Sequence, residues 1–588
     1  MLFIHTFRDP GLSSRRRAIV LFVLLLGLLP EKIQAPSGIL VDQLGYRPDD
    51  PKHAFIRENH GAAFEVWNTV TDEKAYAGKI RTVGTPDLST GDAVFDIDFS
   101  GLTAPGTYQL RIPGTQVRSA PFRIGADVYN TVAMATLESF YYQRCGIDLR
   151  NGTAWNHPGC HLNDAVLYDD PSRHRDVTGG WHDAGDYGKF TVTAAVSAAF
   201  LLYLYELQPG KFTDRQLNIP EAGNGIPDIL DEARWELQWL LKMQSEDGGV
   251  YHKVSTKKWT GEYLPQDDPD VRYIFPVSSA ATGSFSAVSA LGARVFARWD
   301  KQFAFTLLRA SIAGWKYLEN HRTIVPAGGF RNPEGVEGGE YGDQRDEDER
   351  LWASVELFRT TGNDDYRRYF LANYERAGGL AHTVSWGEVQ NFAYSSYLKL
   401  PMNESDFRAR SWIMAGLLTL CDNLLKRVEM NGYRCVLNPD EYYWGSNSVA
   451  AGYAFDLIQG YEATKQARYL DAAVDQLHYL LGRNTFNISF VTGVGANPVR
   501  HPYHQFSMKL HVADPVPGLL AGGPNRFSKL HGATLSQYPA RCYEDDAKNY
   551  FVNEVAINYT APLAFLAGYA GSPGEPLPVK DPAHKQSN

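Results

Sequence analysis

Acidic residues at two places far apart in the sequence could share one catalytic site. Asp183 and Asp186 stand three residues apart in a Gly-rich stretch, so both carboxylates can turn toward a single point. Glu554 precedes an apolar run, and a carboxyl group beside such a wall is desolvated, which raises its pKa and keeps it protonated. A carboxylate and a protonated acid on opposite sides of a substrate are what general acid–base catalysis requires.

Each of these groups also has a simpler interpretation. Asp186 could cap a helix that begins at Tyr187, which would leave Asp183 as an ordinary loop residue. Glu554 could be an N-terminal Glu favoured by the helix dipole, which would lower its pKa instead of raising it. The density of Gly, Trp and Asp around Asp183 favours a site, and the position of Glu554 relative to the Asp pair decides the question.

Two further groups of residues have the chemistry of metal ligands. Cys145, Cys160, His161 and His182 offer two thiolates and two imidazoles, a set that suits tetrahedral, structural Zn²⁺. The alternative is a Cys145–Cys160 disulfide, which would leave both histidines unexplained. An acidic run follows residue 342, and its oxygens suit Ca²⁺, although it could equally be a solvated helix start. The calcium ligands that we expect there are Asp346, Asp348 and Glu349.

The residues that precede these motifs predict a small β-sandwich. Between about Gly38 and Ile124, apolar and polar residues alternate, as in Phe95, Ile97 and Phe99, which is typical of half-buried strands. Turn signals separate several such runs. We therefore predict an immunoglobulin-like sandwich over residues 36–125.

After Gly125 the apolar period becomes helical. We count about twelve helical stretches, which predict an (α/α)6 barrel of two concentric rings over residues 126–571, with long loops gathered at one mouth. An irregular helical array is the alternative. A Pro-, Lys- and Ser-containing tail, 572–588, is predicted to be disordered. The helices are expected to begin near Val128, Tyr187, Pro227, Ala280, Gln302, Asp346, Asp364, Glu388, Ser405, Asn447, Lys465 and Val552.

The first 35 residues have the pattern of a secretory signal peptide. Three arginines, Arg15–Arg17, precede an apolar run from Ala18 to Leu29, which is well short of the roughly 20 residues that span a bilayer. We therefore expect a secreted protein, extracellular or periplasmic, without a stable membrane anchor. The 588-residue chain has a net charge of -10 and 44% hydrophobic residues, which indicates a globular protein and argues against nucleic acid as a partner.

Several motifs together resemble those of the family-nine glycoside hydrolases, which are mostly cellulases. The stretch Gly179–Lys189 is similar to one signature of that family and Tyr543–Ala561 to another, while Ile39–Tyr46 resembles the start of the immunoglobulin-like domain found in one branch. The resemblance implies an (α/α)6 barrel and hydrolysis of β-1,4-glucosidic bonds with inversion. Inversion would place the acid and base carboxyls roughly 6.5–9.5 Å apart.

The resemblance also implies a role for each candidate residue. Asp186 would be the general base, Asp183 its partner in holding the water, and Glu554 the general acid. Zinc at the two cysteines and two histidines, and calcium at Asp348 and Glu349, are implied in the same way.

A third signature of the family departs from its usual form in this chain. In Gly495–Gln505, Tyr503 and Gln505 replace a His and an Arg that contact the glucan in relatives. Loss of Arg removes a fixed cation with several donors, so hydroxyl recognition must differ here. The residues expected to contact substrate are Tyr503, His504, Gln505, Trp444 and Asp545.

These observations predict a secreted, inverting hydrolase of cellulose or related β-glucans, acting as an endoglucanase on a polysaccharide or oligosaccharide. Tyr503 and Gln505 motivate one alternative, an exo-acting β-glucosidase or β-glucosaminidase on short oligosaccharides. A second alternative is a carbohydrate-binding protein without catalysis that uses Trp259, Trp386 and Trp444 as platforms.

Overall fold

The computed structural model describes residues 38–83, 86–259, 261–530 and 533–573. The predicted signal peptide, 1–35, and nearly all of the predicted tail lie outside these described residues. Within them, no helix is long and apolar enough to cross a membrane.

The N-terminal part is built from two small β-sheets. Alternation in the sequence places one face of each strand in a shared core, where Phe64, Val66, Ile97 and Leu110 are buried. One sheet has the order β1(Gly45–Tyr46), β8(Phe122–Ile124), β7(Gly106–Arg111), β3(Ala63–Asn68), β4(Glu73–Lys79); the other has the order β2(His53–Ile56), β6(Phe95–Asp98), β5(Arg81–Thr82).

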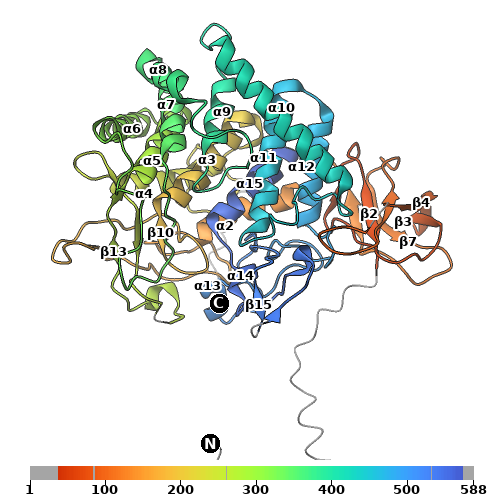
Figure 1. Ribbon diagram of the computed structural model, residues 1–588. Helices are drawn as coiled ribbons and strands as arrows, with labels where there is room; N and C mark the ends of the chain where they lie inside the picture. Colours follow the sequence, from red (N-terminus) through yellow and green to blue (C-terminus); the bar gives the residue numbers. More distant parts are fainter. Residues whose placement is uncertain (1–37, 84–85, 260, 531–532, 574–588) are drawn as a thin grey trace, which may run out of the picture. The chain divides into compact units, whose positions relative to one another are not determined.

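Twelve helices follow in two rings of six, which confirms the predicted (α/α)6 barrel. Figure 1 shows the helices packed together, with strands β2, β3, β4 and β7 of the N-terminal part beside them. Each inner helix contacts the next, and the last returns to the first. The inner helices are α3(Thr191–Leu207), α5(Ser279–Phe296), α7(Glu347–Thr361), α9(Gln390–Leu398), α11(Ser446–Thr464) and α15(Ile557–Ala570). The outer helices are α2(Asn130–Tyr142), α4(Asp228–Lys242), α6(Lys301–Asn320), α8(Asp364–Asn373), α10(Phe407–Met430) and α12(Ala467–Leu480).

The distribution of apolar residues explains which helices are inside. Helices α3 and α5 are buried over nearly their whole length, and α5 is rich in Ala, Ser and Gly, which lets neighbouring helices approach closely. Helix α6 instead buries one stripe that includes Phe303, Leu307 and Leu318, as an outer helix with one solvent-facing side should.

Short elements fill the loops between the helices. One four-stranded sheet has the order β10(Lys189–Phe190), β12(Lys253–Ser255), β13(Tyr273–Ile274), β9(Val166–Leu167), and it anchors the Gly-rich loop that precedes α3. The remaining elements are η1(Pro209–Lys211), β11(Val250–Tyr251), η2(Pro265–Asp267), β14(Val277–Ser278), α13(Gln505–Lys509), β15(Lys529–Leu530), β16(Ala533–Thr534), η3(Pro539–Arg541) and α14(Tyr550–Asn553).

Two expectations about helix starts were wrong. The helix expected from Val552 is instead the short α14, and Glu554 follows it in extended conformation before α15 begins at Ile557. The chain extends here because Glu554 pairs with Tyr503 and Val555 pairs with Ala521 in isolated β-bridges. Asp186 is not a helix cap either, since α3 begins at Thr191 after Phe190.

A buried pair links the sandwich segment to α12. Asp42 accepts a 2.8 Å hydrogen bond from His478, and both side chains are almost inaccessible to solvent. Oδ1 of Asp42 accepts from the Leu44 and Gly45 N–H groups, but loss of His478 leaves Oδ2 buried without this partner.

We expect His478→Ala to lower the free energy of unfolding by about 3 kcal/mol, because it removes the partner of one buried Asp42 oxygen. The change should appear as a lower Tm in a thermal melt. His53→Ala is the matched control, since His53 and Asp96 form a pair of the same length that is 15% exposed on each side. The control should lose about 1 kcal/mol or less. Equal losses in both variants would contradict this assignment.

Candidate active site

Backbone hydrogen bonds hold the loop that carries Asp183 and Asp186, one within the loop and one to the segment around Gln505. The Asp183 N–H donates to the Gly188 carbonyl at 2.8 Å, and the Gln505 N–H donates to the Gly185 carbonyl at 2.8 Å. A Cβ at Gly185 would lie 2.4 Å from the Tyr503 ring and 2.5 Å from its carbonyl oxygen, so only glycine fits there. The loop is therefore pressed directly against the segment around Tyr503.

Glu554 reaches the same place from the other end of the chain. Tyr503 N–H donates to the Asn553 carbonyl at 2.8 Å, and Ile557 N–H donates to the Asp183 carbonyl at 2.7 Å. The Glu554 carboxyl accepts from the Trp444 indole at 3.1 Å and from the Gly185 N–H. The structure thus brings Asp183, Asp186 and Glu554 together.

All three carboxyl groups line one central cavity of about 310 Å³. A large flanking cavity of about 480 Å³ shares four lining residues with it, Tyr341, Trp386, Trp444 and Tyr559. A small flanking cavity of about 40 Å³ shares Asp186, Phe190, Trp259 and Gly339. The three cavities form a cleft whose two arms differ in size, and six of the twelve residues that line its central cavity are aromatic.

Glu554 is held in its neutral form by its surroundings. Burial raises the pKa of its carboxyl well above the usual range, and the charges of Asp186 and Asp183 add to the effect. Hydrogen bonds from Trp444 and Gly185 oppose the shift only in part. The group therefore carries a proton that it can donate.

The two aspartates differ in how their negative charge is compensated. Burial raises the pKa of Asp183 to about 7. The neutral donors Thr193 and Tyr341 lower this pKa only in part, and the Tyr341 hydroxyl lies 2.7 Å from Oδ2. Burial also raises the pKa of Asp186, but here the Gly188 N–H at 2.7 Å and two cations favour the anion. Asp186 is therefore the better placed of the two to act as a base.

The two cations beside Asp186 are Arg272 and Lys253. Arg272 is buried and donates to the Tyr187 carbonyl at 2.6 Å, which fixes the backbone next to Asp186. Lys253 is buried among aromatic rings and donates to Asn332 at 2.7 Å. Burial lowers its pKa to about 7.

Sequence reasoning missed these cations, the hydroxyl groups of Tyr341 and Tyr559 at the central cavity, and the buried Thr193 hydroxyl that donates to Asp183. A signal existed for Tyr341, which lies in the glycine-dense stretch 338–342. Thr193, Lys253 and Arg272 had no comparable signal, because Thr193 lies in α3, Lys253 in β12 and Arg272 just before β13, with no motif around any of them.

Two of the five expected substrate contacts line the cleft, and a third packs against its Gly-rich loop. Trp444 lines the central cavity and Gln505 the small flanking cavity. Tyr503 packs over Gly185, and its hydroxyl is hydrogen-bonded to Gln505.

The other two expected contacts need correction. His504 is buried, and its ring nitrogens bond to Gln143 at 3.0 Å and Ser507 at 2.8 Å, so it supports the loop. Asp545 accepts from the backbone N–H groups of Arg500 and His501 and from the Asn553 amide, so its carboxylate supports this backbone, and it is not among the residues that line the three cavities.

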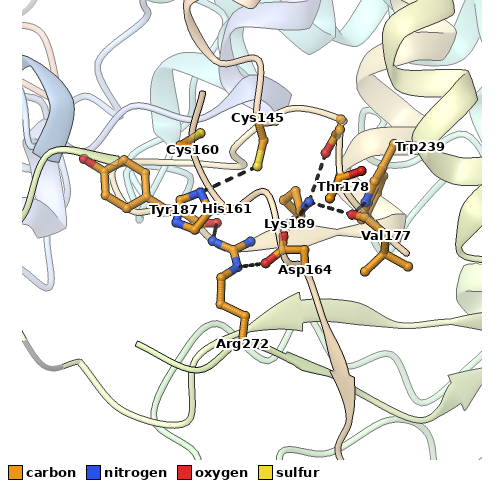
Figure 2. Close-up of polar contacts among 12 residues, drawn as sticks. Cys145, Cys160, His161, Asp164, Val177, Thr178, Tyr187, Lys189, Trp239 and Arg272 are labelled. Carbon is orange, nitrogen blue, oxygen red and sulfur yellow. Dashed lines mark hydrogen bonds and ion pairs between the residues drawn. The ribbon is translucent and has the colours of Figure 1, made fainter. Parts of the chain in front are cut away.

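The expected zinc ligands converge on one point. One ligand atom from each of Cys145, Cys160, His161 and His182 lies within 4.8 Å of all the others. Figure 2 shows three of these residues beside Arg272 and the Lys189–Asp164 ion pair. His161 uses its other nitrogen to reach Asp268 at 3.3 Å, the arrangement that orients a metal-bound imidazole. All five cysteines are free, so the disulfide alternative does not hold.

The expected calcium ligands are only partly together. Asp346 instead forms an ion pair with Arg350 at 2.8 Å, which corrects its assignment. Asp343 is the third carboxylate of this group in place of Asp346. Burial is the main cause of the raised pKa of Glu349, and the charges of Asp348 and Asp343 raise it further. Among the described residues, both carboxylate oxygens of Glu349 and Oδ2 of Asp343 are buried and have no hydrogen-bond partner.

Comparison with known families agrees with this geometry. The family described as glycosyl hydrolase family 9 matches residues 129–567. The chain belongs to this family. A second family, the cellulase N-terminal ig-like domain, matches residues 34–117. The protein is therefore a glycoside hydrolase, and the resemblance read from its motifs is confirmed.

Individual relatives are similar over most of the chain. Endoglucanase D from Acetivibrio thermocellus is 33% identical over 92% of this chain and 84% of its own length. A metagenome-derived glycoside hydrolase family 9 endoglucanase has a TM-score of 0.84 at 36% identity, covering 91% of this chain and 99% of its own. A Zn-binding triple mutant of endoglucanase J30 has a TM-score of 0.83 at 34% identity, covering 90% and 100%.

Removing the Tyr341 hydroxyl should weaken catalysis through Asp183. Without this donor the pKa of Asp183 rises further, so Tyr341→Phe should move the acidic limb of the kcat/KM profile to higher pH. The value at the optimum should fall about tenfold or more, since hydrogen bonds to charged groups contribute about 1.5–3 kcal/mol. Tyr366→Phe, on α8 and remote from the cleft, is the control and should leave the profile unchanged. An unshifted limb in Tyr341→Phe would show that Asp183 does not titrate in the reaction.

Proposed function

We propose that this family member is an inverting β-1,4-glucanase that cuts within the chain of cellulose or a related β-glucan. One observation carries the proposal: three carboxyl groups with unequal proton affinities line a single cavity in an aromatic cleft. Flat aromatic faces suit the apolar faces of glucosyl rings. The name of the relative from Acetivibrio thermocellus supports endo action.

In the proposed reaction, Glu554 donates its proton to the oxygen of the scissile bond as that bond breaks. Asp186 takes a proton from the water that attacks the anomeric carbon, while Asp183 holds that water in place. Glu554 loses one proton and Asp186 gains one, so the net charge of the site is unchanged. Glu554 is then ionised and Asp186 protonated, and a proton must return to Glu554 before the next turnover. Attack from the face opposite the leaving group inverts the anomeric centre.

The unequal arms of the cleft support a second candidate function. A cavity of about 480 Å³ on one side and about 40 Å³ on the other favours a long segment of substrate on one side of the cut only. Such a cleft suits exo action on short oligosaccharides. The sizes of products from soluble cellulose derivatives and from defined oligomers separate the two modes.

We also propose that the enzyme binds two metal ions and is secreted. Cys145, Cys160, His161 and His182 would hold Zn²⁺, which would pin the loop before Asp183. Asp343, Asp348 and Glu349 would contribute to a Ca²⁺ site at the start of α7. The leader pattern in residues 1–35 supports secretion of the mature enzyme.

Glu554→Gln should abolish hydrolysis while leaving binding of β-glucan intact, because the amide keeps the shape but has no proton to give. Loss of a general acid costs about 10²–10⁴-fold in kcat. Hydrolysis is followed on cello-oligosaccharides, with NMR of the first-formed anomer, which should be α. Glu340→Gln, a carboxylate that also lines the cavity, is the matched control and should keep most activity. Full activity in Glu554→Gln, or a β product, would refute the mechanism.

Metal analysis of the purified, dialysed protein should find zinc and calcium bound at separate sites. Cys160→Ser should lose zinc and keep calcium, and Glu349→Gln should do the reverse, so each variant is the control for the other. The loss of zinc should also lower Tm, because a structural metal stabilises the loops that bind it. Retention of zinc in Cys160→Ser, or of calcium in Glu349→Gln, would disprove the corresponding site.

A further inference from the structure

Three buried charged side chains form a chain of ion pairs beside the Gly-rich loop, which we call the Asp164 brace. Its members are Lys189, Asp164 and Arg272, and Figure 2 shows the carboxylate between the two cations. Oδ2 of Asp164 lies 2.8 Å from Lys189 Nζ, and Oδ1 lies 3.0 Å from Arg272 Nε. A buried cation needs a carboxylate partner, and Asp164 supplies one to both cations.

The two cations hold opposite ends of the loop that carries the catalytic aspartate pair. Lys189 Nζ donates to the Val177 and Gly179 carbonyls, each at 2.9 Å. Arg272 Nη1 donates to the Tyr187 carbonyl at 2.6 Å. The loop is therefore tied before and after the aspartates, and the same carboxylate holds both ties.

The short sheet next to the loop explains how the brace is assembled. Arg272 directly precedes β13, and Asp164 lies two residues before β9. These two strands pair in parallel, so both residues lie at the same end of the strand pair. Lys189 begins β10, the edge strand of the same sheet, which continues the loop into α3. Three residues that are far apart in the sequence thus meet through the strands that carry them.

Arg272 also lies beside the proposed general base. Its charge and that of Lys253 favour the Asp186 anion. Of these two cations, Arg272 is the one paired with Asp164, whereas Lys253 is bound to Asn332. Loss of Arg272 from its position would therefore free one end of the loop and remove a charge that keeps the base ionised. The titratable groups that face Asp186 are Arg272, Lys253, Asp268, Asp183, Glu554, Tyr187 and Tyr503.

We propose that Asp164 is a positioning residue for the general base, because it holds the cations that fix both ends of the Gly-rich loop and keeps Arg272 beside Asp186. This inference rests on the proposed function, in which Asp186 takes a proton from the attacking water. A base acts only within hydrogen-bonding distance of that water, so a loop tied at both ends preserves the reacting geometry. Arginine suits this task, since its fork contacts a carboxylate and a carbonyl at the same time.

Two substitutions and their combination test the brace on cellohexaose. Arg272→Met should move the acidic limb of the kcat/KM profile to higher pH, because loss of the cation raises the pKa of Asp186. It should also lower kcat about tenfold with little change in KM, since the base acts in the chemical step. Asp164→Asn should lower kcat by a similar factor. Because Asp164 acts through Arg272, the double variant should lose much less than the product of the two single losses.

Two further variants separate the charge of Arg272 from its shape and from burial. Arg272→Lys keeps the cation, so it should return the acidic limb most of the way to its wild-type position while kcat stays low, because an ammonium group has no fork. Asp475→Asn is the matched control, since Asp475 is an equally buried carboxylate that bridges Arg434 and Arg483 and lines none of the three cavities. It should lower Tm and leave the profile unchanged.

An unshifted acidic limb in Arg272→Met, the same shift in Asp475→Asn, or additive losses in the double variant would overturn the brace. Loss of zinc from Arg272→Met would overturn it too, because the effect would then pass through the metal site. If circular dichroism shows that Asp164→Asn does not fold, the limb in Arg272→Met and its return in Arg272→Lys decide the outcome. If Asp186→Asn hydrolyses cellohexaose at the wild-type rate, the proposed function fails and the brace fails with it, whereas the other outcomes leave the proposed function standing.

Discussion

The active site depends on one close approach, in which the backbone of Gly185 lies against Tyr503 and donates to the Glu554 carboxyl. More than 300 residues separate the two segments, and any side chain at Gly185 would push them apart. Hydrogen bonds from Gln505 to Gly185 and from Ile557 to Asp183 hold them in register. The barrel matters to function chiefly because it delivers the Gly-rich loop and the start of α15 to this contact.

Bringing three carboxyl groups into one cavity creates an electrostatic problem that the surrounding residues resolve unequally. Near neutral pH the cavity cannot hold three full negative charges at low cost. Cations behind Asp186 stabilise its anion, hydroxyl donors partly compensate Asp183, and burial leaves Glu554 protonated. The differences in proton affinity that catalysis needs therefore arise from the different groups that surround each carboxyl in the cavity wall.

The sequence was sufficient to predict the barrel and most helix starts, because periodicity reports burial directly. It also indicated the Asp pair, Glu554 and the zinc cluster, whose residue types are rare in such density. It failed at His504 and Asp545, since no pattern tells whether a polar side chain turns to the substrate or to its own backbone. The break before α15 was hidden for a similar reason: the β-bridge of Glu554 to Tyr503 is a long-range contact that overrides local helix propensity.

Among the contacts between the sandwich segment and the barrel, the side chain of Gln43 supports the loop that leads to this site. Gln43 donates to the Asn487 carbonyl at 2.9 Å and accepts from the Asn497 N–H at 2.7 Å. Gly482 and Gly495, both with positive φ, leave the space that its side chain fills. The loop fixed in this way leads directly to Tyr503, which pairs with Glu554. Because a rigid wall is required to keep the acid aligned, an N-terminal domain that makes no contact with the cavity still contributes to its geometry.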